Sequence, residues 1–234
     1  GVLGAVTAVV LLVFRDTILG FVTGIHVSTS KNLKIGDWIG IPKYNIEGNI
    51  MDINLLTTKI QNFDKTISTI PTYDLLSTEI RNHQVMYEGS SRRIKRSIYF
   101  NIKSFKFVDD EFYEKVKDIN LISEYMDRKL REIAESKKNI PHAERIINGQ
   151  QLTNIGLFRN YVLNYLKNNP KVDQDEIVLV RQLEISPQGM PLEIYCFANK
   201  AELVDYERIQ ADIFDHILTA AQEFDLEIMQ VAKA

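Results

Sequence analysis

The sequence predicts a membrane protein fragment with three consecutive parts: a broken transmembrane helix in residues 1–30, a small five-stranded β-barrel in 31–91 and an α+β domain in 92–234. Three observations predict this order. The first thirty residues hold two uncharged apolar runs around one Arg-Asp pair, and no later stretch is comparably apolar. Short alternating segments separated by turn residues follow, which is typical of strands. The remaining residues combine helical spacing with a second set of alternating segments.

The first apolar run, residues 1–14, is too short to be a complete membrane span. As a helix it would be about 21 Å long, whereas a span needs about 20 residues, so we expect the helix to begin before the first residue of this sequence. Gly1, Gly4, Ala5 and Ala8 recur at steps of three and four and therefore share one helix face. Small residues let helices approach closely in lipid, so this face is predicted to pack against neighbouring helices.

The charged pair Arg15 and Asp16 interrupts the apolar stretch, and residues 17–30 form a second uncharged run that contains Gly20 and Gly24. Charged residues inside a membrane are costly and usually face a helix bundle or water, so we favour a helix that breaks near the pair and lines an aqueous path. In the alternative interpretation, the span ends just before the pair, which marks the membrane interface, and an amphipathic segment follows. Both glycines are predicted to serve helix packing rather than phosphate binding.

The composition bounds the compartment and the class of partner. The formal net charge is −3, so no global charge points to nucleic acid. Cys196 is the only cysteine, which excludes an intramolecular disulfide and is typical of a reducing compartment. Lys31, Lys34 and Lys43 follow the apolar stretch closely. By the positive-inside rule, the chain after about residue 30 is predicted to lie in the cytoplasm.

The β-barrel is predicted from turn residues that separate short alternating segments. A Gly-Asp turn precedes an apolar strand within Lys34–Ile39, and Asn62–Thr66 has the composition of a hairpin connection. Pro71 is expected to end a strand or to lie on an edge strand, because proline cannot donate to a ladder. Several strands within about fifty residues suggest a small five-stranded barrel.

The α+β domain is predicted to contain three strands and three helices in a ferredoxin-like order. The first helix is expected to begin at the acidic residues Asp109–Glu111 and to continue into a charged extension that ends at Lys138. The second is expected to begin at the capping residue Thr153, and the third near Tyr206. A polar loop, 139–151, separates the first two. The expected strands cover the alternating residues 98–102, 177–185 and 192–198.

Signals for catalysis or metal binding are weak. The four histidines show no paired metal-ligand spacing, and the sequence has no phosphate loop or nucleophile elbow. Asp212 and His216 are four residues apart, but a surface pair is far more common at this spacing than a metal site. Cys196 alternates with apolar residues and is predicted to be a small buried hydrophobe. The sequence therefore predicts a protein that is not an enzyme and has no metal or cofactor.

Motifs spread over nearly the whole chain resemble one family of membrane proteins. They are Val13-Phe-Arg-Asp16, Ile18-Leu-Gly20, Ile70-Pro-Thr72, Arg92-Arg-Ile-Lys-Arg-Ser97, Thr153-Asn-Ile-Gly156, Val180-Arg-Gln-Leu183, Pro191-Leu-Glu-Ile-Tyr195 and Ile209-Gln-Ala-Asp-Ile-Phe-Asp-His216. The chain resembles the small-conductance mechanosensitive channel (MscS-like) family, and is most similar to its miniconductance, YbdG-like branch. The longer stretch around residues 139–151 is also consistent with that branch.

The resemblance implies a homoheptamer in the bacterial inner membrane, in contact with lipid and permeating ions. It implies a tension-opened pore that releases ions and small solutes during hypoosmotic shock, with a hollow cytoplasmic vestibule. Seven copies of the first helix would line the pore. By position, Leu12 and Ala8 would form the sealing rings, with a contribution from Val9, and Arg15 and Asp16 would form a charged ring at the kink of the pore helix. The family's earlier membrane helices lie outside this sequence.

Two other classes of function remain open at this point. One is a membrane-anchored binding module, in which an Sm-like barrel and the basic residues of 92–106 bind RNA. A solvated strand face or an interface is the favoured interpretation of this basic run, so no nucleic-acid partner is expected. The other class is a membrane-anchored oligomeric scaffold with a sealed helix bundle, which only a measurement of current distinguishes from a channel.

Overall fold

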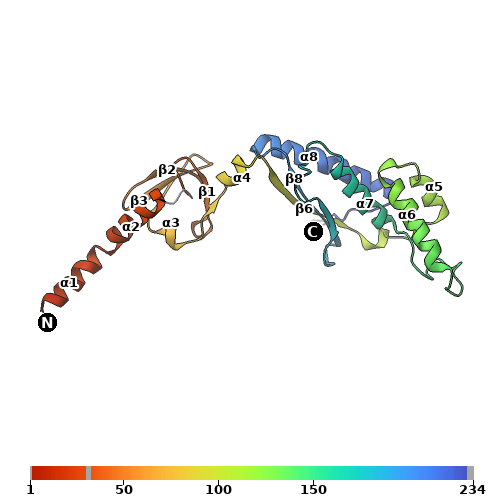
Figure 1. The fold of residues 1–234 in the computed structure, drawn as a ribbon, viewed down its shortest axis with the longest axis horizontal. Coiled ribbons are helices and arrows are strands. Elements are labelled where there is room, and N and C mark those ends of the chain that lie inside the picture. Colours follow the sequence, from red (N-terminus) through yellow and green to blue (C-terminus); the bar gives the residue numbers. More distant parts are fainter. Residues whose placement is uncertain (1, 30–32, 231–234) are drawn as a thin grey trace. The chain divides into compact units, whose positions relative to one another are not determined.

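The computed structural model describes residues 2–29 and 33–230 and divides the chain into two compact units, Gly1–Gly89 and Ser90–Ala234 (Figure 1). The first unit holds the apolar helices and a β-domain, and the second holds the α+β domain. Gly1, one of the predicted helix-packing glycines, lies outside the described residues.

Two helices form the start of the first unit: α1 (Val2–Val13) and α2 (Arg15–Thr29). Phe14 lies in a turn between them, one residue before the predicted break, and the two axes are bent by 56°. The hydrogen-bond ladder continues through the bend, because the Phe14 amide donates to the Val10 carbonyl at 3.0 Å. Within the described residues no single helix is long and apolar enough to cross a membrane, whereas the bent pair together meets that criterion.

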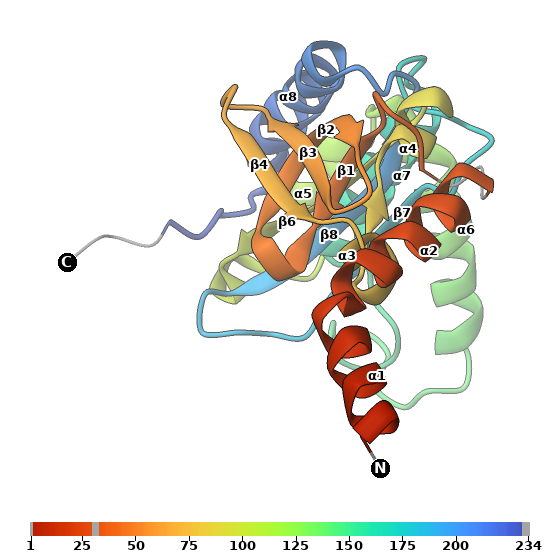
Figure 2. The same cartoon turned by 90° about the vertical axis from the view of Figure 1, so that its left-hand side faces the viewer.

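The β-domain is one curled antiparallel sheet of five strands in the order β4-β3-β2-β1-β5 (Figure 2). The elements are β1 (Trp38–Ile41), β2 (Ile46–Ile53), β3 (Thr57–Asn62), β4 (Ile67–Pro71), β5 (Arg81–Asn82), the 3₁₀ turn η1 (Pro42–Tyr44) and the short helices α3 (Asp74–Ser77) and α4 (Gln84–Glu88). The prediction that Pro71 ends an edge strand is confirmed. Five isoleucines and one leucine form the core, as β-branched side chains suit a half-buried pleated surface: Ile39, Ile41, Ile50, Ile60, Ile70 and Leu75.

The second unit contains a three-stranded antiparallel sheet, in the order β6-β8-β7, and helices that pack on it. Its elements are β6 (Arg92–Phe100), η2 (Ile102–Ser104), α5 (Asp110–Val116), α6 (Asn120–Lys137), α7 (Asn154–Lys167), β7 (Leu179–Gln182), β8 (Met190–Ala198), α8 (Leu203–Ala220) and η3 (Ala221–Phe224). The strand predicted over 177–185 is therefore confirmed but shorter.

The helix predicted from Asp109 to Lys138 is wrong in one respect, because the structure divides it into α5 and α6. Ile119 takes an extended conformation, with φ −78° and ψ 104°, and packs against the core. The helix restarts at Asn120 as a result. The predicted caps are confirmed: the Asp109 carboxylate accepts from the Phe112 amide at 2.8 Å, and the Thr153 hydroxyl accepts from the Gly156 amide at 3.2 Å.

The core of the second unit joins segments that are far apart in the chain. Phe158 packs edge-to-face on Phe100 and Phe224, with ring centroids 5.6 and 5.4 Å away. Asn154 is fully buried, accepts from the Lys106 amide at 3.0 Å and donates to the Phe224 carbonyl at 3.1 Å.

The segment after η3 returns to the end of β6. The Asn101 amide donates to the Glu227 carbonyl, and the Met229 amide donates to the Tyr99 carbonyl, both at 2.8 Å. These bonds extend the sheet at the β6 edge with residues that lie about 130 positions further along the chain.

Candidate functional site

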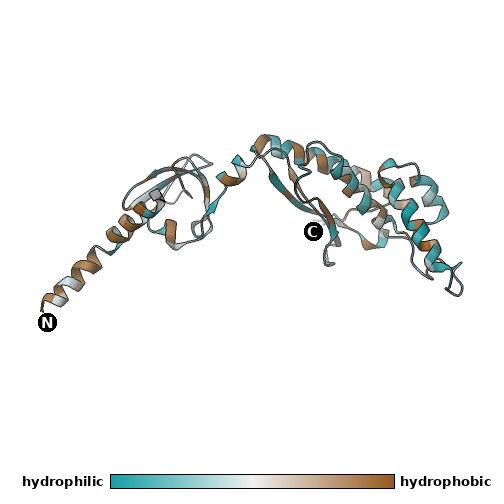
Figure 3. Cartoon of the chain, in the orientation of Figure 1, coloured by the Kyte–Doolittle hydropathy of each residue, from teal (hydrophilic) through white to brown (hydrophobic). Residues whose placement is uncertain are grey.

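The predicted pore residues lie on α1, which has no buried residue in the single chain and is apolar along its length (Figure 3). Leu12 is 72% exposed, Val9 is 60% exposed, and Ala8 is exposed as well. At 3.6 residues per turn, Gly4, Ala5, Ala8 and Leu12 fall within an arc of about 100°. One face of α1 therefore carries the small residues together with the predicted seal.

The opposite face of α1 is bulky. Val2, Leu3, Val6, Val10 and Val13 share it, and all are at least 49% exposed. The Thr7 hydroxyl donates to the Leu3 carbonyl at 2.9 Å, so this polar group is satisfied within the helix itself. The helix as a whole presents apolar side chains that a soluble monomer rarely leaves uncovered.

The charged pair begins α2. Arg15 and Asp16 are exposed, and neither forms an ion pair with another residue in the described part of the chain. Asp16 lies in the first turn of α2, where a carboxylate interacts favourably with the positive end of the helix dipole. The bend thus leaves both charges at the surface of the single chain.

Gly20 seats α2 on the β-domain. A Cβ atom built at this position would lie 1.9 Å from the carbonyl oxygen of Leu55, in the turn between β2 and β3. Only glycine permits so close an approach, and Gly20 and the neighbouring Thr23 are buried. Gly4 and Gly24 differ, because a Cβ at either position would meet nothing within 4 Å in the single chain. The structure therefore gives a packing contact to one of the predicted glycines.

Thr72 hydrogen-bonds to the turn between β2 and β3 against which Gly20 packs, and sequence patterns did not indicate this contact. The Thr72 amide donates to the Leu56 carbonyl at 3.0 Å, and its hydroxyl donates to the Asn54 carbonyl at 2.7 Å. The hydroxyls of Thr58 and Thr72 lie 3.1 Å apart, and both residues are fully buried. The turn that contacts α2, residues 54–56, is consequently fixed to the core of the β-domain; we call this turn the seat of α2.

Asp74, two residues after Thr72, is the centre of a second hydrogen-bond network in the β-domain. It is fully buried and accepts hydrogen bonds from the Tyr44 hydroxyl, from Lys43 Nζ at 3.2 Å and from the Ser77 hydroxyl at 3.0 Å. Burial alone would raise the pKa of Asp74, but the bonds from Tyr44, Ser77 and Lys43 outweigh it and hold the pKa below its ordinary value. An isolated Asp in a short helix gives no sequence signal of this network.

Basic residues of 92–106 contact aromatic and acidic side chains of the second unit itself. The guanidinium of Arg96 lies 4.3 Å from the ring centroid of Phe214, and that of Arg92 lies 4.4 Å from the ring of Tyr206. Lys106 pairs with Asp225 at 2.8 Å. These contacts favour a structural use of the basic residues over a binding surface for nucleic acid.

Asp212, His216 and Cys196, the remaining candidates for metal binding or catalysis, do not lie together in one site. Asp212 pairs with Lys171 at 2.7 Å, whereas Nε2 of His216 lies 2.7 Å from the Tyr161 hydroxyl. The Asp212–His216 spacing therefore does not produce a shared site. Cys196 is buried, as predicted, and burial raises the pKa of its thiol to about 12.

Two family profiles match the chain. "Mechanosensitive ion channel, beta-domain" matches residues 16–85, and "Mechanosensitive ion channel MscS, C-terminal" matches residues 143–228. The low conductance mechanosensitive channel YnaI of Escherichia coli is 24% identical over 208 residues, which are 89% of this chain and 46% of that protein. The chain spans less than half the length of the curated relatives it matches.

Solved structures show the same fold. The cryo-EM structure of Arabidopsis thaliana MSL1 matches with a TM-score of 0.65 and 15% identity over 97% of this chain and 64% of that one. The crystal structure of Helicobacter pylori MscS in the closed state matches with a TM-score of 0.60 and 17% identity over 100% of this chain and 71% of that one. The two profiles, which together cover more than half of the sequence, identify the chain as a member of the MscS family of mechanosensitive ion channels.

Proposed function

We propose that the chain is the pore-forming and cytoplasmic part of a channel subunit that opens under membrane tension and releases ions and small solutes during hypoosmotic shock. The observation that carries this proposal is the bent pair of apolar helices, whose second half is seated on the β-domain through Gly20. Family membership supports it. Within the family we assign the chain to the miniconductance, YbdG-like branch, on the motifs and the long 139–151 stretch.

The proposed assembly is a homoheptamer in the bacterial inner membrane. The exposed apolar surface of α1 supports assembly, because lipid and other copies of the helix are the surroundings that would cover it. The face with Gly4, Ala5 and Ala8 would allow neighbouring copies to approach closely. Residues 1–30 would form the pore segment, 31–91 the β-domain and 92–234 the vestibule, with everything after about residue 30 in the cytoplasm.

Leu12 is the proposed principal seal, with Ala8 and Val9 completing the constriction. A ring of apolar side chains narrows a pore and can empty of water, which blocks ions without a physical plug. Arg15 and Asp16 would form a charged ring just beyond the seal, at the bend. Because both are free of ion pairs with other described residues, their charges are available to act on passing ions.

Tension would act on α1 and leave α2 in place. A state of larger membrane area gains free energy as tension rises, so tension shifts the population towards it. The bend at Phe14 separates the helix in the membrane from the helix seated on the β-domain. Gly20 and the turn behind it would hold α2 while α1 tilts and widens the constriction.

Single-channel recording tests the proposal. Patches should contain the full-length protein in cells that lack other tension-gated channels. We expect current steps that appear only under suction, and a Leu12→Ser variant that conducts at lower tension because serine wets the constriction. Val10→Ser is the matched control, since Val10 lies on the opposite face of α1 and should leave the threshold unchanged.

Two results would contradict the proposal. Silence up to patch rupture, with the protein shown to be assembled in the membrane, would favour a sealed scaffold. Equal thresholds in unmodified protein and Leu12→Ser would leave the channel intact but would remove Leu12 from the seal.

A further inference from the structure

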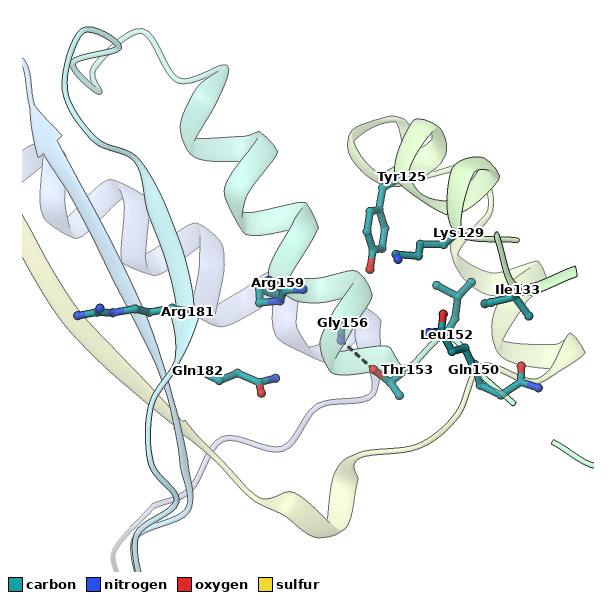
Figure 4. A pocket seen from close by; sticks show the side chains of 11 residues that line it. Tyr125, Lys129, Ile133, Gln150, Leu152, Thr153, Gly156, Arg159, Arg181 and Gln182 are labelled. Carbon is teal, nitrogen blue, oxygen red and sulfur yellow. Dashed lines mark hydrogen bonds between the residues drawn. The ribbon is translucent and has the colours of Figure 1, made fainter. Parts of the chain in front are cut away.

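The second unit contains a cavity of about 600 Å³ that the channel mechanism does not use. It lies between α6, the start of α7 and β7 (Figure 4). Its volume is within the range of about 300–1,000 Å³ that is usual for sites of small molecules. Tyr125 and Lys129 come from α6, Arg159 from α7 and Gln182 from β7.

The polar groups of these side chains converge on one space. Figure 4 shows the Tyr125 hydroxyl and the Lys129 ammonium directed from α6 towards the space beside Arg159, with Gln182 extending towards it from β7. Arg181 also borders the cavity but points away from it, where its Nε and Nη2 bind Glu193 at 2.8 and 2.7 Å. The converging groups come from three elements that are far apart in sequence.

The charged side chains that line the cavity are all cationic: Lys129, Arg159 and Arg181. None of its lining residues is an aspartate or glutamate, and all of them lie in the described part of the chain. Arg159 is half-buried, and its side chain has no hydrogen bond or ion pair to any residue between 33 and 230. Lys129 pairs with Glu132 at 2.5 Å, but this is a surface pair between neighbouring turns, which contributes little and is readily exchanged.

Helix α7 adds its dipole but no free donors. Its first turn starts at the cavity, where the Gly156 amide is bound by the Thr153 hydroxyl and the Ile155 amide by the Asn154 side chain at 2.9 Å. The positive end of the dipole still favours an anion nearby. A ligand would therefore be held by side chains, chiefly Arg159 and Lys129.

We propose that this cavity binds a small phosphate monoester. Two cations and the neutral donors of Tyr125 and Gln182 suit a group with three acceptor oxygens and a charge above one. Ile133 and Leu152, together with the Tyr125 ring, line an apolar side that suits an aryl or alkyl substituent. The proposal does not depend on the channel activity, since every residue it uses belongs to the second unit.

Phenyl phosphate is the probe that tests this site, in calorimetric titration of the purified full-length protein. We expect saturable binding that Arg159→Gln weakens by about 10- to 100-fold, as is usual when a charge-assisted bond is lost. Arg131→Gln removes the same charge from an exposed position on α6 outside the cavity and should leave the affinity unchanged. Benzoate, which carries a carboxylate instead, should bind more weakly.

A second measurement uses the unmodified protein, in case Arg159→Gln does not assemble. Phenylglyoxal modifies accessible arginines, and phenyl phosphate should protect Arg159 from it while Arg131 remains reactive. The proposal is overturned by an absence of saturable binding, by equal weakening in Arg159→Gln and Arg131→Gln, or by unprotected Arg159. Benzoate binding as tightly as phenyl phosphate would overturn the assignment to phosphate.

Discussion

Replacing Gly20 with alanine should loosen the seat of α2 on the β-domain. The new Cβ would lie 1.9 Å from the Leu55 oxygen, and real Cβ contacts essentially never fall below 3.0 Å, so the helix and the turn must separate. Overpacking of this kind costs about 1–3 kcal/mol. Alanine also stabilises a helix by about 1 kcal/mol relative to glycine, and this gain partly offsets the free energy lost to overpacking.

Gly24→Ala is the matched control that removes this ambiguity. It brings the same helix propensity on the same helix, but its Cβ would meet nothing within 4 Å. The difference between the two variants therefore isolates the clash at Leu55. A cost of about 1–3 kcal/mol corresponds to a 5- to 150-fold change in the equilibrium for local opening.

Hydrogen exchange at Thr72 measures this opening in the full-length protein. The Thr72 amide is bound to the Leu56 carbonyl, next to the clash, and is protected as long as the turn stays in place. We expect Gly20→Ala to speed its exchange by the stated factor relative to Gly24→Ala. Equal exchange in both variants would refute the seat at Leu55, and with it the proposed anchoring of α2.

Three further predictions concern two acidic side chains and the buried cysteine. Asp74→Asn should lower the free energy of unfolding by about 1.5–3 kcal/mol, the value of hydrogen bonds to a charged group, as measured by denaturant titration; an unchanged midpoint would contradict the Asp74 network. Burial raises the pKa of Asp74, but its hydrogen bonds from Tyr44, Ser77 and Lys43 lower it further, and the pKa of the exposed Asp225 is lowered by hydrogen bonds from Lys106 and Lys115. Their stabilising contribution is therefore complete above the unfolded pKa of about 4 and is lost as the pH falls through the lower folded values, which a pH series of thermal unfolding would detect. Cys196, with its pKa raised to about 12, should resist iodoacetamide at neutral pH and react once urea unfolds the chain, and mass spectrometry would reveal early labelling.

Local signals predicted the elements that depend on neighbouring residues. The caps Asp109 and Thr153 each bind an amide three positions away, so the pattern that predicts them is contained within one helical turn. The end of β4 at Pro71 follows from the missing amide of one residue. Periodicity likewise located β7 and β8, but the strand predicted over 98–102 is wrong in its bounds, because β6 begins six residues earlier, at Arg92, and Ile102 starts a 3₁₀ turn.

Long-range contacts could not be predicted in this way. Gly20 had a small-residue signal, but only the fold places it against Leu55, 35 positions later, while the similar Gly24 meets nothing. The division between α5 and α6 has no glycine or proline to mark it, and depends on Ile119 reaching the core. The cavity beside Arg159 likewise assembles side chains from three elements, each of which looks like an ordinary surface residue in the sequence.

The pairing between residues 99–101 and 227–229 constrains how the second unit forms during synthesis. Translation is slow compared with the folding of small elements, so β6 exists for some time before residues 227–229 have been made. During that interval the end of β6 presents unpaired backbone groups, the kind of edge that associates with other chains. Copies of the chain made close together would expose the same edge, so this segment is where we expect newly made chains to depend most on chaperones.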